Sequence, residues 1–250
     1  MNIRSSLFAG LLSAVLATAA LPALAHDTTV VASCPILGDM VEQVVGEHAS
    51  VTTIVGPDAD AHVYQPSVAD AKAVAEADII FVNGLGFETW SDTLIAESGT
   101  AGDVFVATEG VSPVMVEGEA DPHAWNALTN GVIYVQNITA AMSEAMPDHA
   151  EDFQANADAY IAQLEALDAE TKAKLAGLNS DRRTVVTAHD AFEYLAAAYG
   201  LNFLAPVGSD TEAEPSAQEL AALITQLREE KVAALFVENI TSPALVQQIS

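Results

Sequence analysis

The sequence predicts an α/β protein with two lobes, each a parallel sheet flanked by helices, joined by a long helix. Short apolar, β-branched segments alternate with segments of helical spacing in the first half of the chain and again after residue 183. Between these two blocks, residues 131–177 carry no strand signal and almost no turn signal. Alternation of strands and helices builds parallel sheets covered on both faces, so the two blocks indicate two lobes.

The first 25 residues have the three-part pattern of a secretory signal peptide. Arg4 precedes an apolar run over residues 7–21, and the sequence Ala-Leu-Ala at residues 23–25 places small residues at a cleavage site. A membrane-spanning helix is the alternative, but the apolar run is short and Pro22 interrupts it. We therefore expect residues 1–25 to be removed and the mature chain to be exported.

The single cysteine, Cys34, excludes an internal disulfide bond. Residues 31–34 (Val-Ala-Ser-Cys) resemble a lipoprotein cleavage box, but residues 26–29 separate them from the apolar run. We interpret Cys34 as a buried residue at the end of the first strand.

The charge balance argues against two classes of partner. The formal net charge is -27, and Lys72 is the only cationic residue in the first half of the mature chain. Nucleic acids and anionic membranes both require cationic patches, so we expect neither as a partner. We interpret the acidic surface as solvated and assign it no mechanistic role.

Residues 26–129 form the expected N-terminal lobe. The turn residues Gly56 and Pro57 end one of its strands, and Gly84 ends another. We expect strands over residues 29–33, 51–55, 78–83 and 104–107, and helices over residues 36–45, 67–76 and 87–97.

Residues 130–178 form the expected helical connection. A first helix covers residues 130–145, and a second, long helix begins at Pro147 and ends at Gly177. Apolar side chains at spacings of three and four predict one buried face along the long helix: Phe153, Ala157, Tyr160, Leu164, Leu167, Leu175 and Leu178.

Residues 179–250 form the expected C-terminal lobe. We expect strands over residues 184–188, 202–205 and 233–237, and helices over residues 190–199, 216–230 and from residue 242 onward. The chain stops at Ser250 inside the last of these helices, and so few elements would leave a sheet edge uncovered. We therefore expect this lobe to be truncated.

Three of the six histidines share one kind of position. His62 lies in the loop that leaves the second strand, and His189 directly follows the strand at residues 184–188. His123 lies in the loop before the helical connection, where one lobe passes into the other. Ligands of open parallel sheets bind at the carboxyl ends of the strands, so these side chains predict a site between the lobes. We interpret the others, His26, His48 and His149, as solvated.

Three histidines at equivalent places favour a metal site over three ordinary loop residues. Neutral imidazole is a ligand suited to zinc and its neighbours. His189 precedes Asp190, which we expect to cap the helix at residues 190–199. The positive end of that helix would disfavour a charged imidazole and keep His189 available for a metal ion.

Four motifs resemble those of the periplasmic zinc- and manganese-binding proteins of ABC importers. They are GPDADAHVYQP at residues 56–66, NGLGFETW at 83–90, DPHAW at 121–125 and HDAFEYL at 189–195. The resemblance covers essentially the whole mature chain. It implies that the helix between the lobes is rigid, that the second motif is structural, and that the other three motifs supply the metal ligands His62, His123 and His189.

The resemblance also implies a fourth ligand, a carboxylate from the C-terminal lobe beyond residue 250. Three nitrogen ligands and one carboxylate favour zinc, whereas a glutamate in place of His189 would favour manganese. Residues 108–121 contain no histidine, unlike the histidine-rich loop of many zinc-binding members, so a separate periplasmic metallochaperone is a possible source of the ion. The expected protein is a periplasmic monomer that delivers zinc, or alternatively manganese, to an ABC permease and its ATPase.

Two other functions are weighed against transport. Three histidines on zinc with an open fourth position could acidify water in a hydrolase, but the chain has no His-Glu-x-x-His helix. The second alternative is an adhesin, and the absence of a convincing lipoprotein box argues for a diffusible protein instead. We therefore expect a binding protein and no enzyme.

Overall fold

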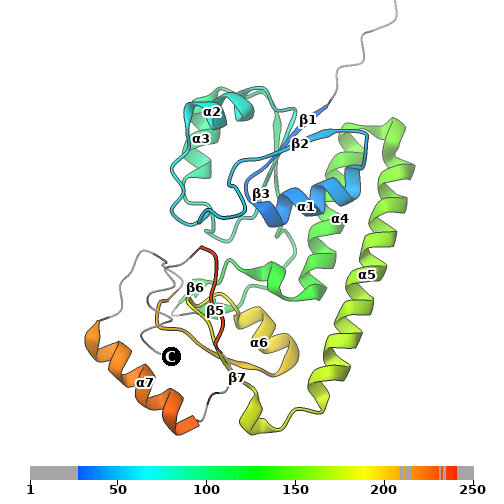
Figure 1. Ribbon diagram of the computed structural model, residues 1–250. Coiled ribbons are helices and arrows are strands. Elements are labelled where there is room, and N and C mark those ends of the chain that lie inside the picture. Colours follow the sequence, from blue (N-terminus) through cyan, green and yellow to red (C-terminus); the bar gives the residue numbers. More distant parts are fainter. Residues whose placement is uncertain are drawn as a thin grey trace, which may run out of the picture.

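The computed structural model describes residues 28–116, 118–208, 211, 216–230, 232 and 235–240. The expected signal peptide and the expected helix from residue 242 lie outside this range. Within it, two α/β lobes are stacked one above the other, and the helices α4 (Leu128–Ala145) and α5 (Ala150–Ala176) run along one side (Figure 1). The predicted fold class is confirmed.

The N-terminal lobe is built on a four-stranded parallel sheet. Its strands lie in the order β2-β1-β3-β4, with bounds Ser50–Thr53, Thr29–Ala32, Ile79–Val82 and Asp103–Val106. The two central strands, β1 and β3, are almost completely buried, as their apolar β-branched sequences require. The helices of this lobe are α1 (Pro35–Val45), α2 (Val68–Ala75) and α3 (Ser91–Ser98).

Local sequence signals explain where these helices begin and end. Pro35 occupies the first turn of α1, where a missing backbone N–H costs nothing. Ser67 caps α2, and its hydroxyl accepts from the backbone N–H of Asp70, whose carboxylate accepts in return from the N–H of Ser67. Helix α3 ends at Gly99, which adopts a left-handed conformation, but it begins at Ser91 and not at Phe87 as predicted.

The helical connection consists of α4, a short 3-10 turn η2 (Pro147–His149) and α5. The predicted apolar face of α5 holds only in its first half. Phe153, Ala157 and Leu164 are buried, whereas Leu167 is 49% exposed. Helices α1 and α4 cover the first half of α5, and the second half passes along the outside toward the other lobe (Figure 1). The prediction of one continuous buried face was therefore wrong at Leu167, whereas Leu175 and Leu178 further along are half-buried.

The C-terminal lobe contains a parallel pair of strands, β7 (Thr184–Val186) and β8 (Asn202–Leu204), with α6 (Glu193–Tyr199) and α7 (Ala217–Glu230). A single bridge pairs Leu235 with Val186, parallel to β7. Helix α6 begins at Glu193 after Phe192, so the expected cap at Asp190 was wrong. Residues 190–192 instead form a loop, because the backbone N–H of Asp190 donates to Val207 and extends the strand pairing past His189.

A small hairpin between the lobes was not predicted. Strand β5 (Met115–Val116) pairs antiparallel with β6 (Glu119–Ala120) in the segment that the sequence analysis treated as a loop. Two-residue strands carry no periodicity, so the sequence offered no signal for them.

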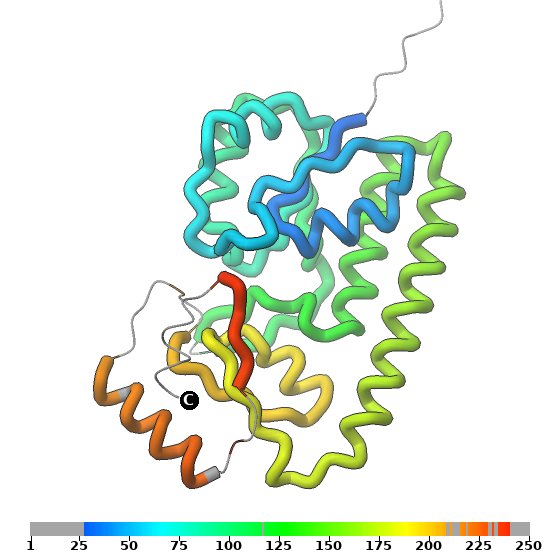
Figure 2. Tube along the Cα trace, in the orientation of Figure 1, coloured from blue at the N-terminus to red at the C-terminus, as the bar shows by residue number. Residues whose placement is uncertain are grey.

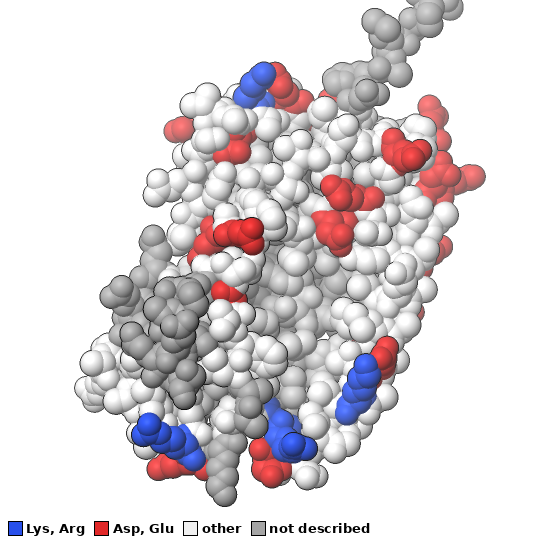
Figure 3. Space-filling model, viewed as in Figure 1, with Lys and Arg blue, Asp and Glu red and all other residues white. Residues whose placement is uncertain are grey.

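Charged side chains are unevenly distributed over the surface. On the face shown in Figure 3, Lys and Arg lie toward the top and bottom of the view beside acidic residues, and the charged side chains visible across the middle are acidic. Among the described residues, no helix is both long enough and apolar enough to cross a membrane.

Replacing Phe153 by alanine should lower the free energy of unfolding by about 3–5 kcal/mol, because a fully buried aromatic ring leaves a cavity between α5 and the N-terminal lobe. Leu167→Ala on the same helix is the matched control and should cost about 0.5 kcal/mol or less. Urea unfolding followed by circular dichroism measures both. Equal losses in the two variants would show that α5 does not pack as described.

Candidate metal centre

Three histidine side chains from three separate loops meet between the lobes. His62 follows β2, His123 precedes the 3-10 turn η1 (Ala124–Asn126), and His189 follows β7. One nitrogen of each ring lies within 4.8 Å of a nitrogen of the other two. His123 and His189 are buried, at 2% and 4% exposure, and His62 is half-buried. The structure therefore brings all three predicted histidines together.

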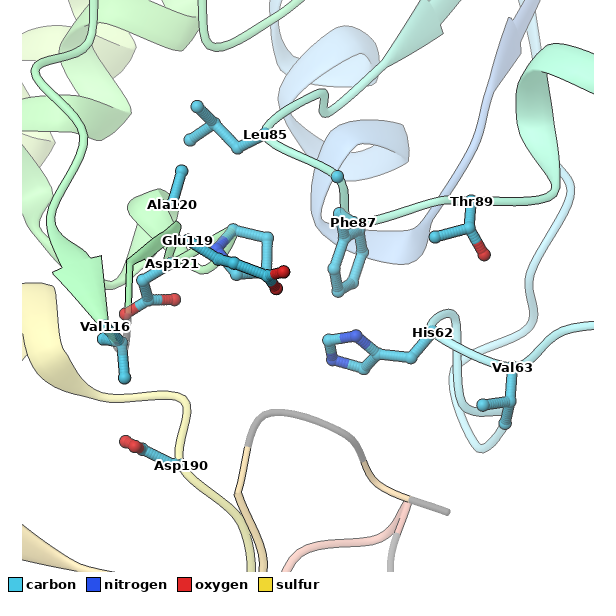
Figure 4. Close-up of a pocket in the computed structure, with 12 residues that line it drawn as sticks. His62, Val63, Leu85, Phe87, Thr89, Val116, Glu119, Ala120, Asp121 and Asp190 are labelled. Atoms are coloured by element: carbon cyan, nitrogen blue, oxygen red, sulfur yellow. The ribbon is translucent and has the colours of Figure 1, made fainter. Parts of the chain in front are cut away.

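Two hollows adjoin the three rings. A cavity of about 250 Å³ is lined by all three histidines together with apolar side chains from both lobes, including Phe87, Trp125 and Phe192. A larger pocket of about 850 Å³, the outer pocket, includes His62 but neither of the other two histidines. Figure 4 shows His62 and Phe87 facing into this outer pocket, with Asp190 on its far side. His62 thus lines both the cavity and the outer pocket.

His62 is held by its own loop. The carboxylate of Asp60 accepts from the backbone N–H of His62 at 2.9 Å, a turn that aspartate forms readily. The indole N–H of Trp90 donates to the carbonyl of Ala61 at 2.7 Å and anchors the loop to α3. The ring of Phe87 packs edge-on against the imidazole, with centroids 4.7 Å apart.

His123 is oriented by Asp121. The Oδ1 atom of Asp121 accepts from the backbone N–H of His123 at 2.9 Å and pairs with Nδ1 of its ring at 2.7 Å. The carboxylate is itself 5% exposed, and the Tyr194 hydroxyl donates to the Asp121 carbonyl at 2.9 Å. A carboxylate that accepts from Nδ1–H leaves the lone pair of a neutral imidazole on Nε2. This nitrogen lies 3.0 Å from Nε2 of His62.

His189 is oriented by Glu238 in the same way. One carboxylate oxygen of Glu238 pairs with Nδ1 of His189, and the other accepts from the backbone N–H groups of Ala188 and His189 at 2.8 and 3.3 Å. Burial acts to raise the pKa of Glu238, but the hydrogen bond and charge interaction with His189 lower it overall. Nε2 of His189 is buried and has no hydrogen-bond partner among the described residues. A buried nitrogen without a hydrogen-bond partner is the kind of atom that a metal ion can coordinate.

Glu238 is the candidate site residue that the sequence analysis missed. It directly follows the strand predicted at residues 233–237, and it lies three residues after Leu235, which pairs with Val186 just before His189. The rule that selected His189 would have selected Glu238 had it been applied to carboxylates as well as imidazoles.

The electrostatic environment favours neutral imidazole. Burial, followed by the proximity of His123, lowers the pKa of His62 to about 4. His62 therefore carries no proton on its second nitrogen at neutral pH, which is the form that binds a metal ion. Two Nε2 atoms 3.0 Å apart also match the separation of about 3.3 Å between two ligands of one tetrahedral zinc ion.

A buried polar network supports the loops beneath the histidines. Glu88 accepts from the backbone N–H groups of Asn83 and Gly84 and from the hydroxyl of Ser33, and its burial raises its pKa. Asn83 donates to the carbonyl of Pro122 at 3.0 Å and accepts from the Tyr134 hydroxyl at 2.6 Å. Within this turn Leu85 has a left-handed backbone, at φ 55°. Residues 83–88 thus join the end of β3 to the loop that carries His123.

A two-lobed α/β fold with three imidazoles gathered between its lobes is an arrangement able to hold a small cation, as a binding protein does. The chain belongs to the family described as the periplasmic zinc-uptake complex component A, whose profile matches residues 30–250.

Relatives and solved structures agree with this family. The manganese ABC transporter substrate-binding lipoprotein PsaA of Streptococcus mitis is 34% identical over 221 residues, which cover 84% of this chain and 72% of that protein. The iron-binding protein YfeA of Yersinia pestis is 34% identical over 228 residues, covering 88% and 72%. The structure of the periplasmic zinc binding protein TroA from Treponema pallidum superposes with a TM-score of 0.86 at 27% identity, covering 90% of this chain and 82% of TroA.

The protein is therefore a metal-binding component of an ABC importer and is not an enzyme, as expected from its sequence.

Replacing Tyr134 by phenylalanine should lower the free energy of unfolding by about 1–3 kcal/mol, because the buried amide oxygen of Asn83 loses its donor. Tyr160→Phe is the control. Its hydroxyl donates at 3.3 Å to Asp39 in an exposed contact, so the change should stay within about 0.5 kcal/mol. Urea unfolding distinguishes the two. An unchanged free energy of unfolding in Tyr134→Phe would show that this network does not support the His123 loop.

Proposed function

We propose that this protein binds one divalent transition-metal ion, zinc in preference to manganese, through Nε2 of His62, His123 and His189, and delivers it to an ABC permease and its ATPase. The observation that carries the proposal is the orientation of the rings. His123 and His189 each engage a carboxylate through Nδ1 and turn Nε2 toward the site. This is the arrangement in which histidine commonly ligates zinc, because the carboxylate fixes the tautomer and raises the basicity of the ligand.

The preference for zinc rests on the donor atoms. The names of the relatives point to manganese for PsaA, to iron for YfeA and to zinc for TroA, so they do not select one ion. Three imidazoles form a nitrogen-rich set that suits zinc, whereas manganese favours carboxylate and water oxygens. Manganese binding by the same residues is the alternative.

Capture and release require the lobes to move relative to each other. His62 and His123 belong to loops of the N-terminal half, and His189 belongs to the C-terminal lobe. Among the described residues, the polar contacts that cross between them near the cleft include the bond from the Tyr194 hydroxyl to the carbonyl of Asp121 at 2.9 Å. Asn126 also donates to the carbonyl of Ala191 at 2.7 Å, and Asn239 donates to the carbonyl of Pro57 at 2.7 Å. Residues 235–240 lie between the lobes beside the cleft (Figure 2). An ion bound by both halves adds ligand bonds to these contacts, and loss of those bonds at the permease would release it.

Several features of this function remain predictions. A carboxylate from the C-terminal lobe is the expected fourth ligand. The protein is expected to act as a periplasmic monomer after removal of residues 1–25. Residues 108–121 contain no histidine, which leaves room for a metallochaperone that supplies the ion.

Competitive titration of zinc and manganese into metal-stripped mature protein tests the ligand set. We expect one tight zinc site that manganese does not displace. His189→Ala should weaken zinc binding by more than about 100-fold, because even a change in the outer shell of a zinc site costs roughly 10–100-fold.

Two results would contradict this proposal. Tighter binding of manganese than of zinc would make the manganese alternative correct. A His189→Ala variant that binds zinc as tightly as the parent would show that His189 is not a ligand.

The role of Glu238 can be measured separately. Glu238→Gln replaces the acceptor of His189 Nδ1–H by a group that can also donate, so zinc affinity should fall about 10–100-fold. Glu119→Gln, an exposed carboxylate on the rim of the outer pocket, removes the same charge without touching a histidine and should change affinity little. Equal losses in both variants would mean that Glu238 acts only through its charge.

A further inference from the structure

A second group of metal-ligating side chains lies away from the cleft. His48, His149 and Asp152 each place one potential ligand atom within 4.8 Å of the others. His48 immediately precedes β2 (Ser50–Thr53), at the amino end of the parallel sheet. The three histidines of the cleft lie beyond the carboxyl ends, so the length of the sheet separates the two groups. In Figure 1 the second group lies where the turn between α1 and β2 meets the start of α5.

One distance in this group matches the spacing between two ligands of a bound transition metal. Nε2 of His48 lies 3.2 Å from Oδ2 of Asp152. Two ligands of a tetrahedral zinc ion, each about 2.0–2.1 Å from the metal, are about 3.3 Å apart. The rings of His48 and His149 stack with centroids 4.1 Å apart and planes inclined by 30°. All ligand atoms of the group lie within 4.8 Å of one another, so holding one tetrahedral ion requires the side chains to turn and to close by up to about 1.5 Å.

Rigid elements hold the three side chains. His48 lies in a turn whose N–H donates to the carbonyl of Val45 at 3.1 Å, and Asn156 of α5 donates to the carbonyl of Val44 at 3.0 Å. His149 ends the 3-10 turn η2, and Asp152 lies in the first turn of α5. Both imidazoles contact the buried ring of Phe153, which forms the floor beneath them. The fold therefore holds these three residues next to one another, although they lie about one hundred positions apart in the sequence.

The surroundings suit a hydrated cation. Glu47 and Glu151 are exposed acidic neighbours, and Asp152 itself is 63% exposed at its side chain. Nearby negative charge raises the local concentration of cations. Two imidazoles and one carboxylate match zinc, copper or nickel better than magnesium or calcium, and open positions remain for water.

We propose that His48, His149 and Asp152 form a second, solvent-accessible binding site for a divalent transition-metal ion of the zinc type. With three protein ligands and an exposed position, this site binds more weakly than the buried cleft and exchanges its ion directly with solvent. It does not depend on the ligand assignment in the cleft, because the two groups share no residue.

Zinc bound per protein, measured by equilibrium dialysis at buffered free zinc and elemental analysis, tests this site in the mature protein. We expect two equivalents in the parent and one in a His123→Ala variant, in which the second site remains. His48→Ala and His149→Ala should each lose the weaker equivalent and keep the tight one, which also shows that these variants are folded. Asp152→Asn should weaken the second site by about tenfold or more, since one of its ligands loses its charge.

Glu151→Gln is the matched control. It removes one negative charge from the residue next to Asp152, yet should leave the second equivalent unchanged. The proposal is overturned if the parent binds one zinc ion per protein and His48→Ala does not change that number. It is also overturned if a second zinc ion still binds in both the His48→Ala and His149→Ala variants. A third contradicting result is an equal loss of affinity for the second zinc ion in Glu151→Gln and Asp152→Asn. If only the cleft fails to bind zinc, the result is different: the parent binds one zinc ion per protein, and His48→Ala abolishes that binding.

Discussion

The parallel arrangement of the strands is the constraint on which the rest of the structure depends. In both lobes every chain segment that leaves a strand emerges at the same edge, and these two edges face each other across the cleft. His62, His189 and Glu238 all follow strands or strand-like segments, so the topology alone brings them to one place. Helix α5 keeps the edges opposed, because its 27 residues span about 40 Å without a break.

Position alone does not make a metal site; the rings must also present the correct nitrogen. Asp121 and Glu238 orient the rings of His123 and His189, because each carboxylate pairs with Nδ1 and leaves Nε2 available to an ion. Burial in an apolar cavity keeps His62 neutral. Beneath these residues the network of Asn83, Glu88 and Tyr134 fixes the loops, so that the site is formed by the fold and need not be assembled by the metal.

Sequence reasoning was strongest where the signal is local and periodic. The strands of both lobes, the break near residue 146 and the long helix all lie where the apolar pattern predicted them, within a few residues. It failed where a distant partner decides the outcome. Leu167 continues the helical pattern but is exposed because α1 and α4 do not reach it. His48 and His149 read as two separate surface residues, yet they stack because the turn before β2 lies against the start of α5.

By itself the sequence determined the fold class, the three candidate histidines in the loops between the lobes and the family resemblance, because these follow from patterns within a few residues. Only the tertiary structure decided which carboxylates orient those histidines and how the lobes enclose them. Glu238 and His189 are 49 residues apart, and the chemistry of an imidazole depends on what touches its second nitrogen. Such contacts are set by the packing of whole elements, which no local pattern records.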